Sequence, residues 1–448
     1  MADSEPFPLL NTSVDQLHSA VEHSSNPPRT RRRKSSALGQ DIRAGDTGPA
    51  LASYTAGDSP TSPTAPTKRF SKRRRARGVL SRFRQTMIRH TYLVPAIIIF
   101  VFAALYAVNP SPSNPVHRFI FLSYRLPPDP AIPDAPAQYG KGLWDIAFVS
   151  FYTIVLTFTR EFIMQKLLRP LARAAGLRSR GKQARFMEQM YTAIYFACLG
   201  PAGMYVMSRT PVWYFSTRGM YEAFPHMTHD AGFKFYYLFQ AAYWAQQALV
   251  LLLGLEKPRK DFKELVGHHI VSLALIALSY RFHFTYMGLA VYTTHDISDF
   301  FLATSKVLNY IDSPIVAPYF FFFVCVWIYL RHFINLKIII SLFTEYTTVG
   351  PFELNWATQQ YKCTLSQYIT LGLLASLQAL NLFWLFHIFR IAYRFLAHNI
   401  AEDDRSEAEG TDAEDETPKT LSDQKTNGHA TGVSSSAAQA RAVNGSAR

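Results

Sequence analysis

Residues 264–308 read ELVGHHIVSLALIALSY-RFH-FTYMGLAVYTTHDISDFFLATSKVL. Two largely apolar runs, of 17 and 25 residues, stand on either side of the short connection RFH at 281–283. A membrane-spanning helix needs about 20 mainly apolar residues, which is longer than most helices of soluble domains. The stretch therefore predicts two antiparallel transmembrane helices joined by a tight turn.

Six further runs of the same kind lie outside this stretch. They cover Tyr92–Val108, Leu143–Met164, Phe186–Ser208, Phe233–Leu255, Pro314–Phe333 and Gln367–Phe389. The first begins after a long polar segment, so it does not fit a cleaved signal peptide. The predicted fold class is all-α: a polytopic membrane helix bundle with about eight transmembrane helices.

Charged and aromatic residues are unevenly distributed along the 448 residues, whose net charge is +14. Residues 1–90 hold 4 of the 64 aromatics and a net charge of +9, and residues 399–448 hold none and a net charge of −5. Such segments cannot bury enough apolar surface to offset ordering entropy, so we expect two disordered tails. Residues 91–142 then form the first transmembrane helix and a lumenal loop, and 143–398 form the main membrane domain. Three cysteines without a CxxC pair exclude a disulfide scaffold and a zinc module.

Lys and Arg residues between the spans predict the orientation of the bundle. Residues 68–89 carry ten of them, 166–185 carry seven and 257–263 carry four. The alternate connections carry three or fewer, so the basic segments fall on one side at every turn. Because basic loops face the cytosol, both tails are predicted to be cytosolic.

The basic runs at 29–34 and 68–77 have two interpretations. Such runs serve nuclear localisation or nucleic-acid binding in some proteins. A polybasic segment next to a span is more typical of a topology anchor that contacts anionic lipids. Since about eight spans exclude a free nuclear protein, we favour the membrane interpretation and expect no nucleic-acid partner.

Ionisable side chains inside two predicted spans are the strongest functional signal. The fifth span contains His268 and His269, and the sixth contains His295, Asp296 and Asp299. Ionisable groups are costly in a bilayer and are therefore functional candidates by default. At about 1.5 Å per residue, the His pair lies roughly 6–8 Å from the cytosolic helix end and the Asp pair roughly 13–18 Å. The two pairs are predicted to meet in the cytosolic half of the bilayer.

The local spacing of these residues limits what they can do together. Asp296 and Asp299 share a helix face, whereas His268 and His269 point about 100° apart, so only one imidazole faces a given point. A carboxylate beside that imidazole would fix its tautomer and raise its basicity. One alternative is a polar network that only holds two helices together. Another is a metal site, but HH and DxxD lack a specific metal spacing, so we expect catalysis and no metal.

Other polar side chains in the spans are given structural roles. Gln240 is expected to join helices through hydrogen bonds. Arg331 and His332 are placed near the lumenal end of the seventh span, where long side chains reach the interface. The tryptophans are expected in interface belts or in packing.

The segment 261–313, from DFKELVGHHIV through FHFTYMGLA and HDISDFFL to SKVLNYIDS, closely resembles the longevity-assurance motif of ceramide synthases, within the TLC-domain family. Further segments at 158–165, 357–363 and 381–394 are similar to the fungal branch, and neither tail is covered. The resemblance implies a TLC-type catalytic membrane domain over 143–398 in an endoplasmic-reticulum enzyme. Such an enzyme transfers a long or very long fatty acyl group from acyl-CoA to the 2-amino group of a sphingoid base.

The resemblance also implies roles for individual residues. The histidines and aspartates that the family requires correspond to the catalytic candidates His268, His269, Asp296 and Asp299. Candidate accessory residues are His295, Ser298 and Asn309. His295 stands where yeast-like members carry Met, and this leaves open which imidazole Asp296 orients.

The expected reaction suits this set of residues. An amine is largely protonated at neutral pH and must lose a proton before it attacks a thioester. His268, supported by His269, is then either the general base or a nucleophile that first takes the acyl group. The aspartates would orient the imidazole and hold the cationic amine.

Two charged segments outside the spans have two interpretations each. Lys257, Arg259, Lys260 and Lys263 either contact the phosphates of CoA or act only as a topology anchor. Ser406 and Thr411 are each followed by acidic residues. They are either phosphorylated by an acidophilic kinase of the casein-kinase-2 type or belong to a plain solvated tail.

No tightly bound cofactor is expected, because acyl-CoA is a co-substrate. The implied partners are membrane lipids, acyl-CoA, the sphingoid base, a small single-span accessory subunit and a second synthase in a homo- or heterodimer. In the family, chain-length preference depends partly on the lumenal loop, here about 344–365. Alternatives from other classes are a non-catalytic TLC-domain lipid chaperone or scaffold and an ion-coupled lipid transporter. The complete His/Asp set argues against the first, and the lack of an inverted repeat of broken helices argues against the second.

Overall fold

The computed structural model describes residues 85–398, apart from 88, 129, 131–134 and 255–259. The two predicted disordered tails therefore fall largely or wholly outside the described residues, as do Ser406, Thr411, Lys257 and Arg259. The described residues belong to one compact unit.

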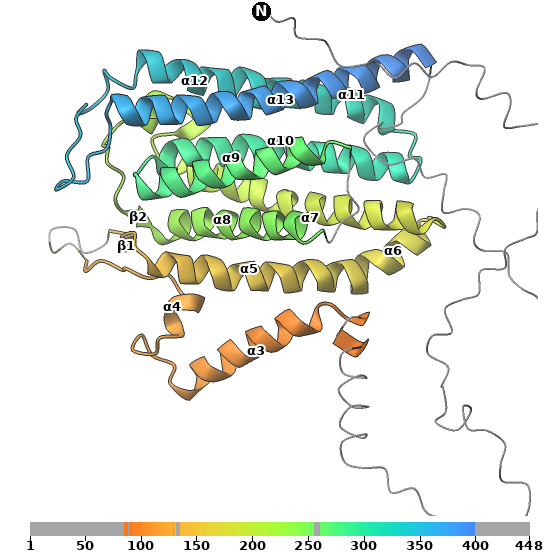
Figure 1. Cartoon of the computed structure of the whole chain (residues 1–448), viewed down its shortest axis with the longest axis horizontal. Helices are drawn as coiled ribbons and strands as arrows, with labels where there is room; N and C mark the ends of the chain where they lie inside the picture. The colour runs from red at the N-terminus through yellow and green to blue at the C-terminus, as the bar shows by residue number, and fades with distance from the viewer. Residues whose placement is uncertain (1–84, 88, 129, 131–134, 255–259, 399–448) are drawn as a thin grey trace, which may run out of the picture. The chain divides into compact units, whose positions relative to one another are not determined.

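The described chain is a bundle of helices, which confirms the predicted fold class (Figure 1). In chain order its helices are α3 (Leu93–Val108), α4 (His117–Ile120), α5 (Trp144–Phe162), η1 (Ile163–Leu168), α6 (Arg169–Ala174), α7 (Arg180–Ser208), η2 (Trp213–Phe215), η3 (Arg218–Met220), α8 (Ala231–Leu252), α9 (Phe262–Arg281), α10 (Thr285–Tyr310), α11 (Val316–Trp327), η4 (Ile328–Ile334), α12 (Asn335–Thr344) and α13 (Thr364–His398). The strands β1 (Gln138–Tyr139) and β2 (His229–Asp230) form one short antiparallel pair between loops.

Each of the eight apolar runs forms a helix, but their lengths differ. Five continuous helical segments in the described residues are long and apolar enough to cross a membrane. They are Trp144–Ala174, Arg180–Ser208, Phe262–Arg281, Val316–Thr344 and Thr364–Ala397. The helix α3 is apolar but has only 16 residues. A multi-pass helical membrane fold is therefore established, and the count of eight spans stays a prediction.

The helix α10 lies at the centre of the bundle and packs against α7, α9, α11 and η4. Figure 1 shows the α9–α10 pair between α13 and α8, with α5 beyond α8. Close approach of α7 to its neighbours depends on Gly203, because a Cβ there would lie 2.4 Å from the Tyr236 hydroxyl and 3.1 Å from Thr293 Oγ1. Small residues let helix backbones come together in this way.

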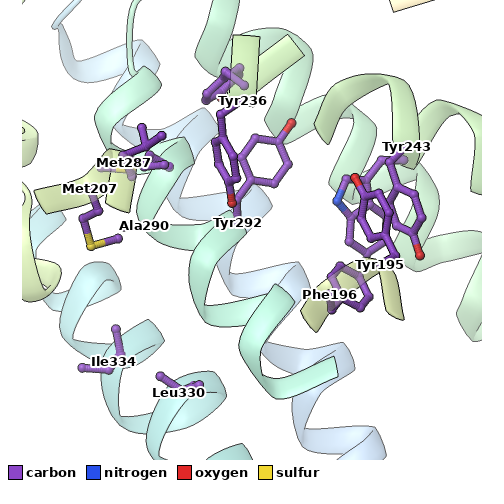
Figure 2. Close-up of a cluster of buried hydrophobic side chains, with 14 of the residues drawn as sticks. Tyr195, Phe196, Met207, Tyr236, Tyr243, Met287, Ala290, Tyr292, Leu330 and Ile334 are labelled. Carbon is purple, nitrogen blue, oxygen red and sulfur yellow. The ribbon is translucent and has the colours of Figure 1, made fainter. Parts of the chain in front are cut away.

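Aromatic side chains fill the core between α7, α8 and α10 (Figure 2). Tyr195 stacks on Tyr243 with ring centroids 3.7 Å apart, and Tyr236 meets Tyr292 edge to face at 6.4 Å. The Tyr195 hydroxyl donates a hydrogen bond to Gln240 Oε1 across 3.1 Å. The core therefore fixes the position of a polar side chain as well as excluding water.

The seventh long helix departs from its predicted end at Phe333. It continues through the π-helix η4 into α12 and ends at Thr344. Arg331 and His332 are only 2% and 7% exposed, so the prediction that they reach the membrane interface is wrong. Arg331 and His332, which suggested a helix end, form hydrogen bonds with Asp299 and Gln378 on other helices. Because these polar groups are satisfied inside the bundle, the helix can continue past them.

Candidate functional site

Asp296, on α10, is completely buried and is held by α8. Its Oδ2 accepts hydrogen bonds from the Tyr236 hydroxyl at 2.9 Å and from the Gln240 amide. Its Oδ1 is also buried and has no partner among the described residues. One oxygen of this carboxylate is therefore fixed, and the other remains able to accept a hydrogen bond from a further group.

Asp299 has a different partner, although it lies one turn from Asp296. Its Oδ1 accepts from Arg331 Nη2 at 2.5 Å. Arg331 Nε donates to Ser298 Oγ at 2.7 Å, and its guanidinium lies 4.4 Å from the centre of the Trp327 ring. A third long helix, α13, joins this network, because Arg331 Nη1 donates to Asn381 Oδ1 across 3.1 Å. The charge pair is thus well supported by hydrogen bonds, as a buried ion pair must be.

His268 and His269 differ in their surroundings. His268 is 5% exposed, and its ring lies edge-on to Trp384 and Trp244, with centroids 5.1 and 5.6 Å away. His269 is half-buried, and its Nδ1 donates to the Leu265 carbonyl at 2.8 Å. The two ring planes are 89° apart. The imidazoles therefore diverge, in line with their adjacent positions on a helix, and His268 is the more enclosed one.

His268 has an unused ring nitrogen. Its Nδ1 is buried without a partner among the described residues, and its Nε2 lies 3.5 Å from Ser272 Oγ. A buried imidazole nitrogen without a protein partner is rare, because such a group costs free energy unless something satisfies it. This atom is available for a substrate.

His295 presents a second such nitrogen. Its Nδ1 lies 2.8 Å from the Val291 carbonyl, which only accepts, so Nδ1 carries the proton in the neutral ring. The lone pair is then on Nε2, which is buried and has no partner in the described part of the chain. His295 therefore has the hydrogen-bonding pattern of a general base.

An apolar cavity begins beside these groups. Trp244, Ser272 and His295 line one part of it, and its walls come from α9, α10 and α13. Its volume is about 200 Å³. It extends to Phe284, eleven residues from His295 on α10, which corresponds to about 16 Å along the helix. Residues Leu354, Trp356 and Tyr361 of the segment between α12 and α13 line its far part.

Other predicted site residues lie elsewhere. Asn309 is ten residues beyond Asp299, or about 15 Å along α10, and so lies well away from the cavity. Lys260 and Lys263 are exposed at the start of α9. This is the end of α9 that lies nearer to His268, five residues or about 8 Å after Lys263. In the described residues, no group of three or more His, Cys, Asp and Glu side chains is placed to hold a metal ion.

Sequence reasoning missed three contributors to this site. Arg331 was assigned to the interface, and Tyr236 and Trp384 were given no contact with the His and Asp residues. Gln240 was assigned to helix joining, which is correct, but its partner is the Asp296 carboxylate. The available signal was charge: a carboxylate in an apolar span requires a donor from another span.

Comparison with known proteins places these residues in a wider group. A TLC domain matches residues 185–390. The chain is 53% identical over 332 residues to the sphingosine N-acyltransferase-like protein FUM17 of Gibberella moniliformis, covering 73% of this chain and 85% of that protein. It is 47% identical over 357 residues to the sphingosine N-acyltransferase lac1 of Schizosaccharomyces pombe, covering 79% and 91%. It is also 47% identical over 340 residues to the ceramide synthase LAG1 of Saccharomyces cerevisiae, covering 75% and 81%.

Proposed function

The chain belongs to the TLC-domain family, in its ceramide synthase branch, and on this basis we propose that its buried His and Asp residues transfer a fatty acyl group from acyl-CoA to a sphingoid base. The enzyme is a sphingosine N-acyltransferase, a multi-pass membrane protein that forms ceramide. One observation supports the proposed centre most strongly. Buried nitrogens of His268 and His295 that have no partner among the described residues occur at or next to an apolar cavity.

The proposed chemistry needs a proton acceptor at the amine. The sphingoid ammonium gives one proton to an imidazole nitrogen, and the free amine then attacks the thioester carbonyl carbon. The new C–N bond forms as the C–S bond breaks, and the imidazolium gives its proton to the leaving thiolate. The regenerated imidazole then takes the second proton from the new amide nitrogen and releases it to solvent. His268 Nδ1 and His295 Nε2 are the two candidate acceptors, because each is buried and has no hydrogen-bond partner in the part of the chain that the structure describes.

A two-step route uses the same atoms. The imidazole of His268 attacks the thioester first, and CoA leaves as the thiolate. The sphingoid ammonium gives one proton to His295 Nε2, which passes it to the thiolate. The free amine then displaces the imidazole from the acyl group, and its second proton goes to solvent. In both routes, the free Oδ1 of Asp296 accepts a hydrogen bond from the substrate ammonium and orients it. Asp299 is already paired with Arg331, so its role is to position the α10 segment that carries Asp296.

The cavity accounts for a long hydrocarbon chain. Its walls are almost entirely apolar, and each methylene removed from water contributes about 0.8 kcal/mol. The acyl chain would lie along α9, α10 and α13, with its carbonyl carbon near His268 and His295. His269 lies outside this cavity and would help to position the neighbouring His268 on α9. Ser298 would act indirectly, because it accepts a hydrogen bond from Arg331, the partner of Asp299.

The basic end of α9 would receive the CoA phosphates. Lys260 and Lys263 lie there, and Lys257 and Arg259 precede them outside the described residues. This assignment puts the start of α9 at the cytosolic face of the endoplasmic reticulum, with both termini cytosolic. A small accessory subunit, dimerisation and phosphorylation of Ser406 and Thr411 are further parts of the proposal.

Acylation assays on microsomes test the proposal directly. Wild type, His268→Ala, His295→Ala and Asp296→Ala are compared with one sphingoid base and a defined acyl-CoA. We expect losses of about 10²-fold or more, which are typical when an acid–base group is removed. His387→Ala, a half-buried histidine on α13, is the matched control and keeps its activity. Equal rates in all five proteins would reject the site. A scaffold would show no acylation in wild type, and a transporter would instead move substrate in a vesicle flux assay.

A further inference from the structure

A loop closes the part of the cavity farthest from His295. Residues 345–363, here called the cap loop, connect α12 to α13. Leu354, Trp356 and Tyr361 of this loop line the cavity. The opposite side of the same part is formed by Phe282 and Phe284, in the connection between α9 and α10. The size of this part of the cavity therefore depends on how the cap loop is held against the α9–α10 connection.

His283, in the α9–α10 connection, makes the central contact with the cap loop. Its Nε2 lies 2.9 Å from Gln359 Oε1. Its ring also stacks on that of Tyr361, with centroids 5.8 Å apart and planes 15° apart. Tyr361 in turn meets Trp356 edge to face at 5.2 Å. His283 thus contacts two residues of the cap loop at the same time, the polar Gln359 and the cavity-lining Tyr361.

The surroundings of His283 make its hydrogen bond directional. Gln359 Oε1 can only accept, so the proton of the neutral ring is on Nε2 and Nδ1 is left to accept from Lys141 Nζ, 3.3 Å away. Nε2 therefore donates to Gln359 Oε1. Burial lowers the pKa of His283 to about 4, so the ring is neutral near pH 7 and keeps this single arrangement.

The backbone supports the same conclusion. His283 has φ of 67° and Gln359 has φ of 56°, a region that residues other than glycine seldom adopt. Such conformations cost on the order of 1–3 kcal/mol each and persist only where the surroundings hold them. His283 and Gln359, which meet across this hydrogen bond, both adopt this positive-φ conformation. The contact is thus a defined connection between two turns.

We propose that His283 is a specificity-determining residue: through Gln359 and Tyr361 it latches the cap loop over the far part of the cavity and so limits the length of acyl chain that is accepted. The inference rests on the proposed function, because it assumes that the cavity holds the acyl chain. A long acyl chain reaches Trp356 and Tyr361, and it fits only if the cap loop that carries these two side chains moves away from the cavity. A short chain ends before them and does not depend on the latch.

The test measures kcat/KM for a series of acyl-CoAs of increasing length with one sphingoid base. His283→Ala and Gln359→Ala each remove one side of the hydrogen bond. We expect both to raise the ratio of long-chain to short-chain kcat/KM by about three- to tenfold, the effect of one net hydrogen bond. The double variant shifts the ratio no further than the larger single one, because both remove the same contact.

A conservative variant and a control separate a latch from simple structural damage. His283→Gln places an amide donor near the former Nε2 and is expected to keep the wild-type ratio. His117→Ala, on α4 and away from the cavity, also leaves the ratio unchanged. A uniform fall of kcat/KM for every chain length in His283→Ala and Gln359→Ala would overturn the latch. If the wild-type protein instead shows no acylation of the sphingoid base with any acyl-CoA of the series, the proposed function itself is overturned.

Discussion

Arg331 and Asp299 come from different long helices and meet with Nη2 and Oδ1 2.5 Å apart. The arginine side chain is 2% exposed and also contacts Ser298 and Asn381, so a single cation joins α10, η4 and α13. Asp296, one turn away, is tied instead to α8. The two aspartates therefore anchor α10 from two sides, and each anchor can be tested separately.

Arg331→Met is expected to destabilise the folded protein by about 3–5 kcal/mol, because it leaves the largely buried Asp299 carboxylate without its cation. The double variant with Asp299→Asn removes both charges and should recover most of the thermal midpoint. Activity should stay low in the double variant, since the position of α10 is no longer fixed by the ion pair. Thermal unfolding in detergent and acylation rates on the same samples measure both effects. A double variant as active as wild type would show that the pair has only a structural role.

Tyr236→Phe is expected to lower kcat by about 10-fold, with a smaller effect on stability, because it removes a donor from Asp296 Oδ2. Gln240→Leu should act in the same direction, as it removes the other donor. Tyr191→Phe is the matched control. Its hydroxyl is buried and makes no hydrogen bond with the described residues, so its loss should leave kcat unchanged. Similar rates for Tyr236→Phe and Tyr191→Phe would contradict a role for this hydrogen bond.

Acidification is expected to destabilise the region around the α9–α10 connection. Burial is the largest cause that lowers the pKa of His226 and of His283 from 6.5 to about 4 each. The unfolded chain then binds more protons than the folded one between these values, so stability is full above pH 6.5 and falls as the pH decreases towards 4. Between pH 7 and 5 the loss is about 2 kcal/mol per histidine.

Thermal midpoints measured between pH 7 and 5 test this dependence. The variants His226→Gln and His283→Gln each remove one titrating group, so the pH dependence should become shallower in each. A slope that is unchanged in both variants would show that other groups cause the acid sensitivity.

Replacing Lys260 and Lys263 by Ala is expected to raise the KM for acyl-CoA several-fold with little change in kcat, because both lie exposed at the α9 end nearer to His268. The difference in KM between this variant and wild type should become smaller as the salt concentration increases, because salt screens the attraction between lysine and phosphate. Arg218→Ala removes an exposed cation that is paired with Glu222 away from this end, and serves as control. An unchanged KM in the Lys variant would leave these residues as topology anchors.

The sequence predicted the bundle well because hydrophobic length is a local property. The runs at 264–280 and 284–308 became helices within a few residues of their expected ends. The divergence of His268 and His269 also followed from helix geometry alone. Such features need no knowledge of which helices are neighbours.

The partners of the polar residues were harder to predict. Arg331 looked like an interfacial residue because a charge near the end of an apolar run commonly is one. Its partner Asp299 lies 32 residues earlier and on another helix. The contact of Gln240 with Asp296, 56 residues away, is of the same kind. Pairings of this type depend on helix packing, which one sequence without a structure does not specify.

The wide turn η4 makes the helix Val316–Thr344 sensitive to where its number of residues changes. A π turn accommodates one more residue than the α turn it replaces. Deleting one residue from Ile328–Ile334 would return this turn to ordinary α geometry and leave the later side chains facing as before. The same deletion within α11 would rotate all later side chains by about 100° relative to those before. The buried Asn335 and Ile338 would then leave the bundle interior. Homologous chains should therefore tolerate the loss of one residue in this turn far better than the same loss in α11.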